Sequence, residues 1–248
     1  MYAVLSPAKR LNANVEVLPK QKPTFWTESR SLAQIVREMS SAELQSLMKI
    51  SPSLGDLNRE RFQSLSLSKV QGSPAFLTFA GDTYIGLSAN TLTPEQLAWS
   101  QTRIGILSGL YGLLRPLDPI EPYRLEMGTK LKNPTGGNLY TFWGDKIRQE
   151  LEGRLENHQD KRIINLASDE YFKATGKLSV PVVNPVFKDW KNGKYKVISF
   201  SAKRARGRMA RYIIDNKIER SEDLKAFDCD RYRYSAEHSD QQNWVFLR

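Results

Sequence analysis

The chain alternates short apolar runs with segments in which apolar residues recur every three or four positions. Apolar runs bounded by turn residues are typical of buried strands, whereas recurrence at three and four positions is typical of amphipathic helices. The runs predict strands at residues 2–5, 75–79, 103–107 and 162–168, and Tyr84 and Ile85 are expected to continue an extended segment. These strands would form the centre of a sheet.

Two further strands are predicted in the carboxyl-terminal third, at 178–187 and 194–200. The pair Asn192-Gly193 between them is a strong signal for a two-residue hairpin turn. The end of the chain, NWVFLR at 243–248, is aromatic and strand-like, so we expect it to dock on the sheet.

Helical periodicity predicts helices at 29–39, 94–101, 139–157 and 201–217, and two short helices within 40–66. Thr93 is expected to cap the helix at 94–101, and Ser168 is expected to cap a short helix that begins with two acidic residues. The mixture of strands and helices favours the α+β class: one mixed-sheet domain over 1–248 with surrounding helices.

The pair of helices within 40–66 has the clearest local signals. Ser40 with Glu43 forms a capping-box pattern, and Ser53 with Asp56 is expected to begin the second helix. The spacing resembles a helix-hairpin-helix unit, in which amides at the start of the second helix can hold a DNA phosphate. The glycine-rich hairpin of that unit is missing, so a plain helical hairpin packed on the core is the alternative.

The composition is that of an ordinary globular protein of 248 residues, with 40% hydrophobic and 26% charged residues. The start of the chain does not resemble a signal peptide, and no apolar run approaches the roughly 20 residues needed to span a bilayer. We therefore expect a cytoplasmic protein that does not bind membranes.

Cysteine and histidine are too scarce for most metal or nucleophile chemistry. Cys229 stands alone between two aspartates, which raise a thiol pKa, so we interpret it as inert. The two histidines, His158 and His238, lie in polar segments. We expect no metal site and no cofactor, and direct binding of iron is poorly supported because no ligand spacing is recognisable.

Net charge is the global property that indicates a partner. The chain carries 37 basic and 27 acidic residues, a balance of +10. Residues 191–220 hold ten basic and two acidic residues, so 10 − 2 = +8 of charge is concentrated in this segment. Such a balance favours polyanions such as nucleic acid, although many basic proteins bind only small phosphorylated ligands.

The helix at 201–217 contains most of this charge. On a helical wheel Arg204, Arg208 and Arg211 fall on one solvent-facing stripe, whereas Lys203 and Arg206 fall toward the flank of the apolar face. We expect Lys203 and Arg206 to point into a pocket.

A rigid charged loop over 107–128, LSGLYGLLRPLDPIEPYRLEMG, is the second candidate site. Its prolines, three residues apart, favour an extended or turning backbone, and irregular loops often carry sites. Arg115 and Asp118 could instead simply pair with each other. Asn165 is a further candidate, because an amide in a short apolar strand needs partners if it is buried.

Six motifs together resemble the YaaA family of bacterial peroxide-stress proteins. They are SPAK at 6–9, FAGDTYIGL at 79–87, the 107–128 loop, LYTFWGD at 139–145, INLASDEYFK at 164–173 and SFSAKRARG at 199–207. The resemblance runs over essentially the whole chain. It implies an α/β fold with a positively charged cleft and a helix-hairpin-helix-like element, resistance to hydrogen peroxide, restraint of free iron, and binding of double-stranded DNA.

The resemblance also implies which polar side chains share the cleft, and the helical pair and basic helix supply candidate DNA contacts. The cleft residues are Ser6, Lys9, Asp82, Tyr84, Ser108, Tyr111, Arg115, Asp118, Tyr123, Arg124, Glu126, Asn165, Ser168, Lys203 and Arg206. The candidate DNA contacts are Lys49, Ser53, Arg59, Arg61, Arg204, Arg208 and Arg211. Arg208 lies outside the family motif.

Two functions are compatible with these residues. The first is binding of double-stranded DNA with little sequence preference, through phosphates. The second is an enzyme that acts on a nucleotide or on damaged nucleic acid, since carboxylates and cations converging in one cleft can perform acid and base chemistry. We also predict that Arg115, Arg124 and Glu126 lie near Lys9 and Arg206.

Overall fold

A mixed eight-stranded sheet forms the centre of the computed structural model, which describes residues 1–12 and 21–248. The main path runs β11 (Arg233–Tyr234), β12 (Asn243–Leu247), β9 (Val182–Lys191), β8 (Ile163–Leu166), β1 (Tyr2–Leu5), β5 (Ile104–Ser108) and β6 (Gly112–Leu114), and β10 (Lys194–Lys196) pairs with β9. Neighbours from β12 to β5 pair in parallel, whereas β6, β10 and β11 pair antiparallel. The carboxyl ends of five strands therefore share one edge.

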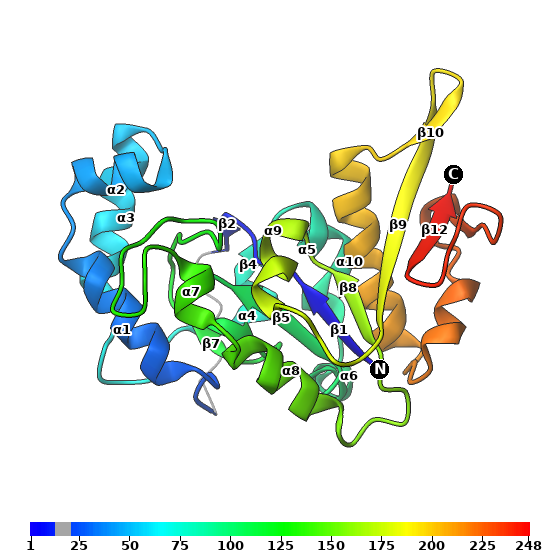
Figure 1. The fold of residues 1–248 in the computed structure, drawn as a ribbon, viewed down its shortest axis with the longest axis horizontal. Helices are drawn as coiled ribbons and strands as arrows, with labels where there is room; N and C mark the ends of the chain where they lie inside the picture. The colour runs from blue at the N-terminus through cyan, green and yellow to red at the C-terminus, as the bar shows by residue number, and fades with distance from the viewer. Residues whose placement is uncertain (13–20) are drawn as a thin grey trace.

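Helices surround this sheet in the described parts of the chain, which confirms the mixed fold class (Figure 1). They are α1 (Trp26–Arg37), α2 (Ser41–Met48), α3 (Pro52–Ser64), α4 (Ala75–Thr78), α5 (Asp82–Leu87), α6 (Pro94–Ser100), α7 (Leu139–Trp143), α8 (Lys146–Leu155), α9 (Asp169–Phe172) and α10 (Ser199–Asp215). Two small two-stranded sheets pair β2 (Arg10–Leu11) with β4 (Phe79–Ala80) and β3 (Ser73–Pro74) with β7 (Pro119–Ile120).

The elements form two upward projections in Figure 1. Helices α2 and α3 form the one at the left, and α10 with the long β9–β10 hairpin and β12 forms the one at the right. None of the helices in residues 1–12 and 21–248 is long and apolar enough to cross a membrane.

The three central strands confirm the predicted apolar runs. Every residue of β1, β5 and β8 is buried. A parallel sheet covered on both faces requires such continuous apolar sequence, because neither face contacts water. The hairpin at 192–193 is also confirmed, since Asn192 and Gly193 both adopt positive φ between β9 and β10.

Helix caps were predicted well where the signal is local. Ser40 and Thr93 both form complete capping boxes, with Glu43 and Gln96 respectively. The start of α3 was predicted wrongly: Ser51, not Ser53, is its cap, and its hydroxyl accepts from the Leu54 amide at 3.4 Å. Pro52 explains the shift, because proline has no N–H and its fixed φ suits the first helical position.

The predicted strand at 75–79 is wrong, because residues 75–78 form the buried helix α4. A short apolar run does not distinguish a strand from a buried helical turn. The 107–128 loop decides the conformation here: its carbonyl oxygens at Asp118 and Pro116 accept hydrogen bonds from the amides of Ala75 and Phe76. The extended structure expected at Tyr84 and Ile85 is also wrong, because both lie in helix α5.

Two other boundaries moved for local reasons. The helix predicted at 139–157 is broken at Gly144, whose positive φ of 46° separates α7 from α8. The strand predicted at 194–200 ends at Lys196, and α10 begins at Ser199. The terminal strand at 243–248 docks on β9 as β12, as predicted.

Candidate functional site

The site begins where β1 and β8 end at the shared carboxyl edge. Ser6 follows β1 and Ser168 follows β8. The Ser6 hydroxyl accepts from the Ser168 amide at 2.9 Å and donates to the Ser168 hydroxyl at 3.3 Å. Ser168 occupies the N-cap position of α9, as predicted, but within the described residues its hydroxyl is bonded to Ser6 and makes no capping hydrogen bond to α9.

A cavity of about 280 Å³ opens above this pair, and we call it the cationic cavity. Four basic side chains line it, those of Lys9, Arg10, Lys203 and Arg206. Asp82 is the acidic residue in its lining. Tyr84 also lines it, and the Tyr84 hydroxyl donates to the Ser6 carbonyl at 3.0 Å. The excess of positive charge makes the cavity suited to an anion.

Close packing of two helices places Lys203 and Arg206 in this cavity. Helix α10 crosses α5 at Gly86 and Gly207. A Cβ on Gly86 would lie 2.1 Å from the Arg204 carbonyl oxygen, so the backbones are in direct contact. Lys203 and Arg206 thus line a pocket, as predicted.

Arg206 is the least satisfied of these cations. Its Nε is buried and has no hydrogen-bond partner within the described residues. Burial lowers the pKa of Arg206, and the negative charge of Asp169 opposes that shift. Four arginines of the described chain have such a buried Nε, and among them Arg206 is the one that lines the cationic cavity. Its guanidinium can therefore donate to an anionic ligand with oxygen acceptors.

Part of the charged loop joins the same region. Lys9 Nζ lies 3.0 Å from Glu126 Oε2, and Arg124 lies 2.9 Å from the other carboxylate oxygen of Glu126. The predicted proximity of Lys9 to Arg124 and Glu126 is therefore found, and Lys9 shares the cationic cavity with Arg206.

Arg115 and Asp118 do not share this region, so that part of the geometric prediction is wrong. Strand β6 runs antiparallel to β5, with Leu114 opposite Ile106, and it carries the chain back toward the amino-terminal edge of the sheet. There Arg115 binds the fully buried Asp118 at 2.8 Å and also donates to the Lys22 carbonyl. Burial raises the pKa of Asp118, against the effect of Arg115. The pair stabilises the loop.

Three other predicted cleft residues form a buried network behind the site. The hydroxyls of Ser108 and Tyr123 lie 2.6 Å apart, and the Tyr111 amide donates to Ser108 at 2.9 Å. Burial raises the pKa of Tyr84, Tyr111 and Tyr123 above the usual range. These phenols stay protonated, so the network serves to hold the loop in place.

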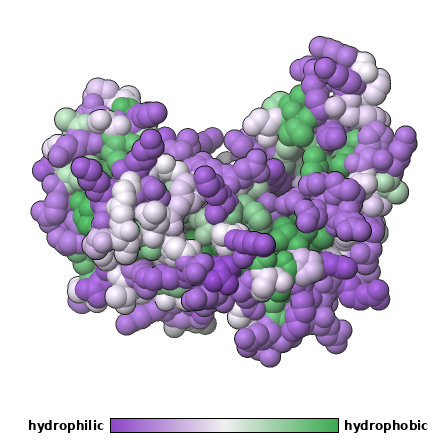
Figure 2. Space-filling view, viewed as in Figure 1, coloured by the Kyte–Doolittle hydropathy of each residue, from purple (hydrophilic) through white to green (hydrophobic). Residues whose placement is uncertain are grey.

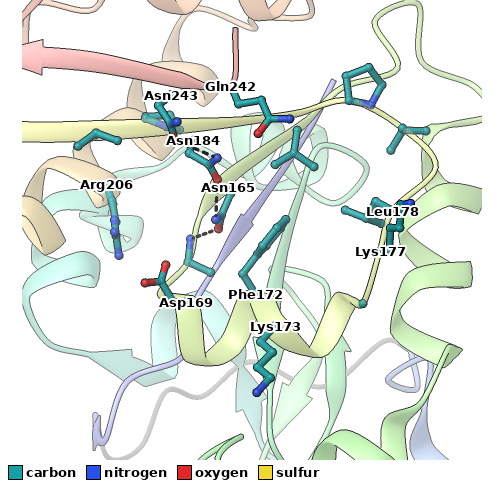
Figure 3. A pocket seen from close by; sticks show the side chains of 17 residues that line it. Asn165, Asp169, Phe172, Lys173, Lys177, Leu178, Asn184, Arg206, Gln242 and Asn243 are labelled. Carbon is teal, nitrogen blue, oxygen red and sulfur yellow. Dashed lines mark hydrogen bonds between the residues drawn. The ribbon is translucent and has the colours of Figure 1, made fainter. Parts of the chain in front are cut away.

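Asn165 lies in a different and larger cavity of about 690 Å³, which we call the amide cavity (Figure 3). Asn165 donates to Asn184 at 3.0 Å, and Asn184 donates to Asn243 at 3.3 Å. Asn165 was predicted as a site residue and Asn184 was not, although the sequence carries the same signal for Asn184: an amide within the apolar strand VVNPVF. Arg206 lines both cavities.

The arginines proposed to contact DNA differ in whether they are already paired with a carboxylate. Arg204 is exposed, whereas Arg208 pairs with Asp230 at 3.8 Å and Arg211 pairs with Asp215 at 2.8 Å. Arg211 also donates to the Ser88 carbonyl and to Thr91, so it joins α10 to the segment after α5. Of the three arginines in the predicted solvent-facing stripe, Arg204 is therefore the one without an ion pair or side-chain hydrogen bond to the described residues.

On the other projection, Lys49 and Arg59 are exposed, and Arg61 is half-buried with a pKa lowered by burial. Ser53 lies 3.1 Å from the capping Ser51 hydroxyl. Gly55 packs against α2, where a Cβ would lie 2.5 Å from Gln45 Cγ. Helices α2 and α3 thus form a tight helical hairpin, and the helix-hairpin-helix interpretation of it stays a prediction.

Metal and thiol chemistry find little support in the described ranges. No group of three or more histidine, cysteine, aspartate or glutamate side chains in residues 1–12 and 21–248 could hold a metal ion. Cys229 is half-buried, and its pKa is raised by burial and by Asp228.

Comparison with known proteins agrees over the length of the chain. The model of the family described as "Peroxide stress protein YaaA" matches residues 1–238. A UPF0246 protein of Janthinobacterium sp. (strain Marseille) is 48% identical over 256 residues, covering 100% of this chain and 98% of that protein. UPF0246 proteins of Caulobacter vibrioides (strain NA1000 / CB15N) and Saccharophagus degradans (strain 2-40) are 48% and 47% identical, each covering 100% of this chain and 99% of their own. The chain therefore belongs to the YaaA family of peroxide stress proteins.

Proposed function

We propose that this protein binds double-stranded DNA with little sequence preference during the response to hydrogen peroxide. In this response the protein would limit oxidative damage to DNA and the level of free intracellular iron. Phosphate contacts through cations and amides are sufficient for it, and no base-reading helix is required.

The observation that carries this proposal is the cationic cavity. Arg10, Lys203 and Arg206 converge on it, and none of the three has a hydrogen-bond or ion-pair partner among the described side chains. Cations that pair with a carboxylate are largely neutralised, whereas these three keep their charge available for phosphate oxygens.

The shape of the molecule is compatible with a duplex. Figure 2 shows that the upper surface dips between the two projections and is largely hydrophilic there. Arg204 lies in the first half of α10 on one projection. On the other, Lys49 caps the end of α2, and Arg59 and Arg61 lie on α3. A duplex in this depression would meet cations from both sides.

The test is a titration of a short duplex, followed by fluorescence anisotropy, at several salt concentrations. If six to ten phosphates are neutralised, affinity falls on the order of a thousandfold between about 50 and 200 mM salt. Replacing Arg10, Lys203 and Arg206 by glutamine should weaken binding and reduce the salt slope by about two to three. A salt-insensitive binding curve would contradict the proposal.

A matched control removes the same charge elsewhere. Arg30, Lys69 and Arg220 are exposed and form no ion pair within the described chain, so their triple glutamine variant has the same net charge as the first. If both triple variants lose affinity equally, net charge rather than the cavity explains binding.

The second candidate is an enzyme that acts on a nucleotide or on damaged nucleic acid. Asp82 supports it, because this carboxylate lines the cationic cavity beside Lys203 and Arg206. Asp82→Asn removes one negative charge, so a pure DNA binder should bind as tightly as before or more tightly. Loss of peroxide protection with unchanged duplex affinity would favour the enzyme.

A further inference from the structure

The amide cavity, with a volume of about 690 Å³, is not explained by the proposed function, and its lining is unusual. Three amide side chains form a hydrogen-bonded row across β8, β9 and β12, through Asn165, Asn184 and Asn243. Asn243 is fixed in turn by Asp240, which accepts from its amide nitrogen at 2.9 Å. The row is therefore held rigidly by the sheet.

The row leaves hydrogen-bonding groups available toward the cavity. Each of the Asn165 and Asn184 amide nitrogens makes one hydrogen bond within the described residues, whereas an amide nitrogen has two N–H donors. The side-chain amide of Gln242, exposed at the rim, forms no hydrogen bond within the described residues. An amide side chain carries a donor and an acceptor side by side, and so does the edge of a nucleobase. Asparagine or glutamine can therefore form two hydrogen bonds to one base at the same time.

The side of the cavity opposite the row carries apolar side chains together with Lys173 and Lys177. Phe172 projects from α9 toward the amide row, and Leu178 lies across from it in Figure 3. An aromatic ring beside a row of amides provides a stacking surface for a planar base together with groups that read its edge. A volume of about 690 Å³ is ample for a ligand of that size.

Arg206 connects the amide cavity to the cationic cavity. Its side chain lines both, and Figure 3 shows it facing Asp169 at the rim of the amide cavity. Its buried Nε has no partner within the described residues. A base among the amides could therefore have its phosphate close to Arg206.

We propose that the amide cavity binds a nucleobase whose attached phosphate is held by Arg206. The base can come from an unpaired nucleotide of bound DNA or from a free mononucleotide. The DNA source rests on the proposed function, whereas the free nucleotide does not.

Calorimetric titration of the whole protein tests the base pocket. The probes are the four deoxynucleoside monophosphates, with deoxyribose 5-phosphate and inorganic phosphate as probes without a base. Mononucleotides should bind at least about tenfold more tightly than deoxyribose 5-phosphate, because stacking alone is worth roughly 1–3 kcal/mol. Equal binding of deoxyribose 5-phosphate and all four mononucleotides would overturn the proposal.

Variants identify the residues responsible. Gln242→Leu at the exposed rim and Asn184→Leu in the row should each weaken mononucleotide binding about fivefold or more, with phosphate binding unchanged. Gln149→Leu, on the exposed side of α8, is the matched control and should have no effect. Because Asn184 lies within the sheet, Gln242→Leu keeps the test valid if Asn184→Leu fails to fold. Unchanged mononucleotide binding in Gln242→Leu and folded Asn184→Leu would overturn the assignment.

A second pair of probes separates the two sources. A duplex with one bulged nucleotide is compared with the same duplex carrying an abasic bulge. Tighter binding of the bulge that has a base, lost in Gln242→Leu, would identify DNA as the source. Mononucleotide binding without this difference would identify a free nucleotide. Failure to bind any duplex contradicts the proposed DNA function alone, and the mononucleotide titrations still decide the pocket.

Discussion

Gly207 of α10 lies against the backbone of Thr83 in α5 so closely that a Cβ on Gly207 would be 1.8 Å from the Thr83 carbonyl oxygen. That contact fixes the distance between the helix that carries Lys203 and Arg206 and the helix that carries Asp82 and Tyr84. The composition of the cationic cavity thus depends on a residue that has no side chain.

Gly207→Ala should destabilise the protein and weaken duplex binding. The added methyl group meets backbone, which cannot rotate away, and overpacking of this kind costs about 1–3 kcal/mol or more. Chemical denaturation measures the loss. Gly153→Ala on α8 is the control, since nothing lies within 4 Å of its Cβ position, and it should gain about 0.5–1 kcal/mol from helix propensity. Equal stability of Gly207→Ala and wild type would show that the helices separate easily.

Asp118→Asn should lower stability without changing the duplex affinity of the folded protein. Asp118 is fully buried and accepts from the amide and the guanidinium of Arg115. Removing one member of such a pair costs roughly 2 kcal/mol or more, because the other charge is left without compensation. Urea denaturation measures the loss, and exposed Asp223→Asn should change little. Weaker duplex binding by folded Asp118→Asn would show that Arg115 and Asp118 contribute to the binding site after all.

Sequence reasoning succeeded where the determinant is local or fully buried. The capping boxes at Ser40 and Thr93 and the buried strands β1, β5 and β8 were predicted because short segments determine them. It failed for α4 and α5, whose conformations depend on distant partners such as the Ser6 carbonyl that accepts from Tyr84.

The site was predicted in part for a similar reason. Residues that follow parallel strands, such as Ser6 and Ser168, meet at one edge by topology alone. Arg115 follows β6, and the local sequence pattern does not predict that this strand pairs antiparallel with β5. Asn184 was not predicted, because the partner of its amide, Asn165, lies on a different strand and the local pattern of VVNPVF does not show it.

Glu126→Gln should tighten duplex binding at low salt. Glu126 neutralises both Lys9 and Arg124, and Lys9 lines the cationic cavity. Loss of the carboxylate frees two cations, so we expect a gain of about threefold or more at low salt that shrinks at higher salt as screening increases. Glu156→Gln is the control for net charge, because it removes the same single negative charge at an exposed position. Weaker binding instead would mean that Glu126 is needed to orient Lys9 and Arg124.

His158 should make the protein less stable as the pH falls below its usual titration range. Burial foremost, and then the Met1 ammonium 3.3 Å away, lower the pKa of His158 from 6.5 to about 4. Between these two values the unfolded chain binds a proton that the folded protein does not. Stability from this group is therefore complete above 6.5 and is lost as the pH falls toward 4, at up to about 1.4 kcal/mol per pH unit.

The check is urea denaturation of wild type and His158→Gln over this range of pH, comparing slopes rather than absolute stabilities. Wild type should lose roughly 1–2 kcal/mol more than the variant between about pH 6.5 and pH 5, since carboxylates titrate alike in both proteins. His238→Gln, at an exposed position, should keep the wild-type slope. If His158→Gln has the wild-type slope as well, then His158 accepts a proton in the folded protein, and the contact between its ring and the Met1 ammonium must open as the pH falls.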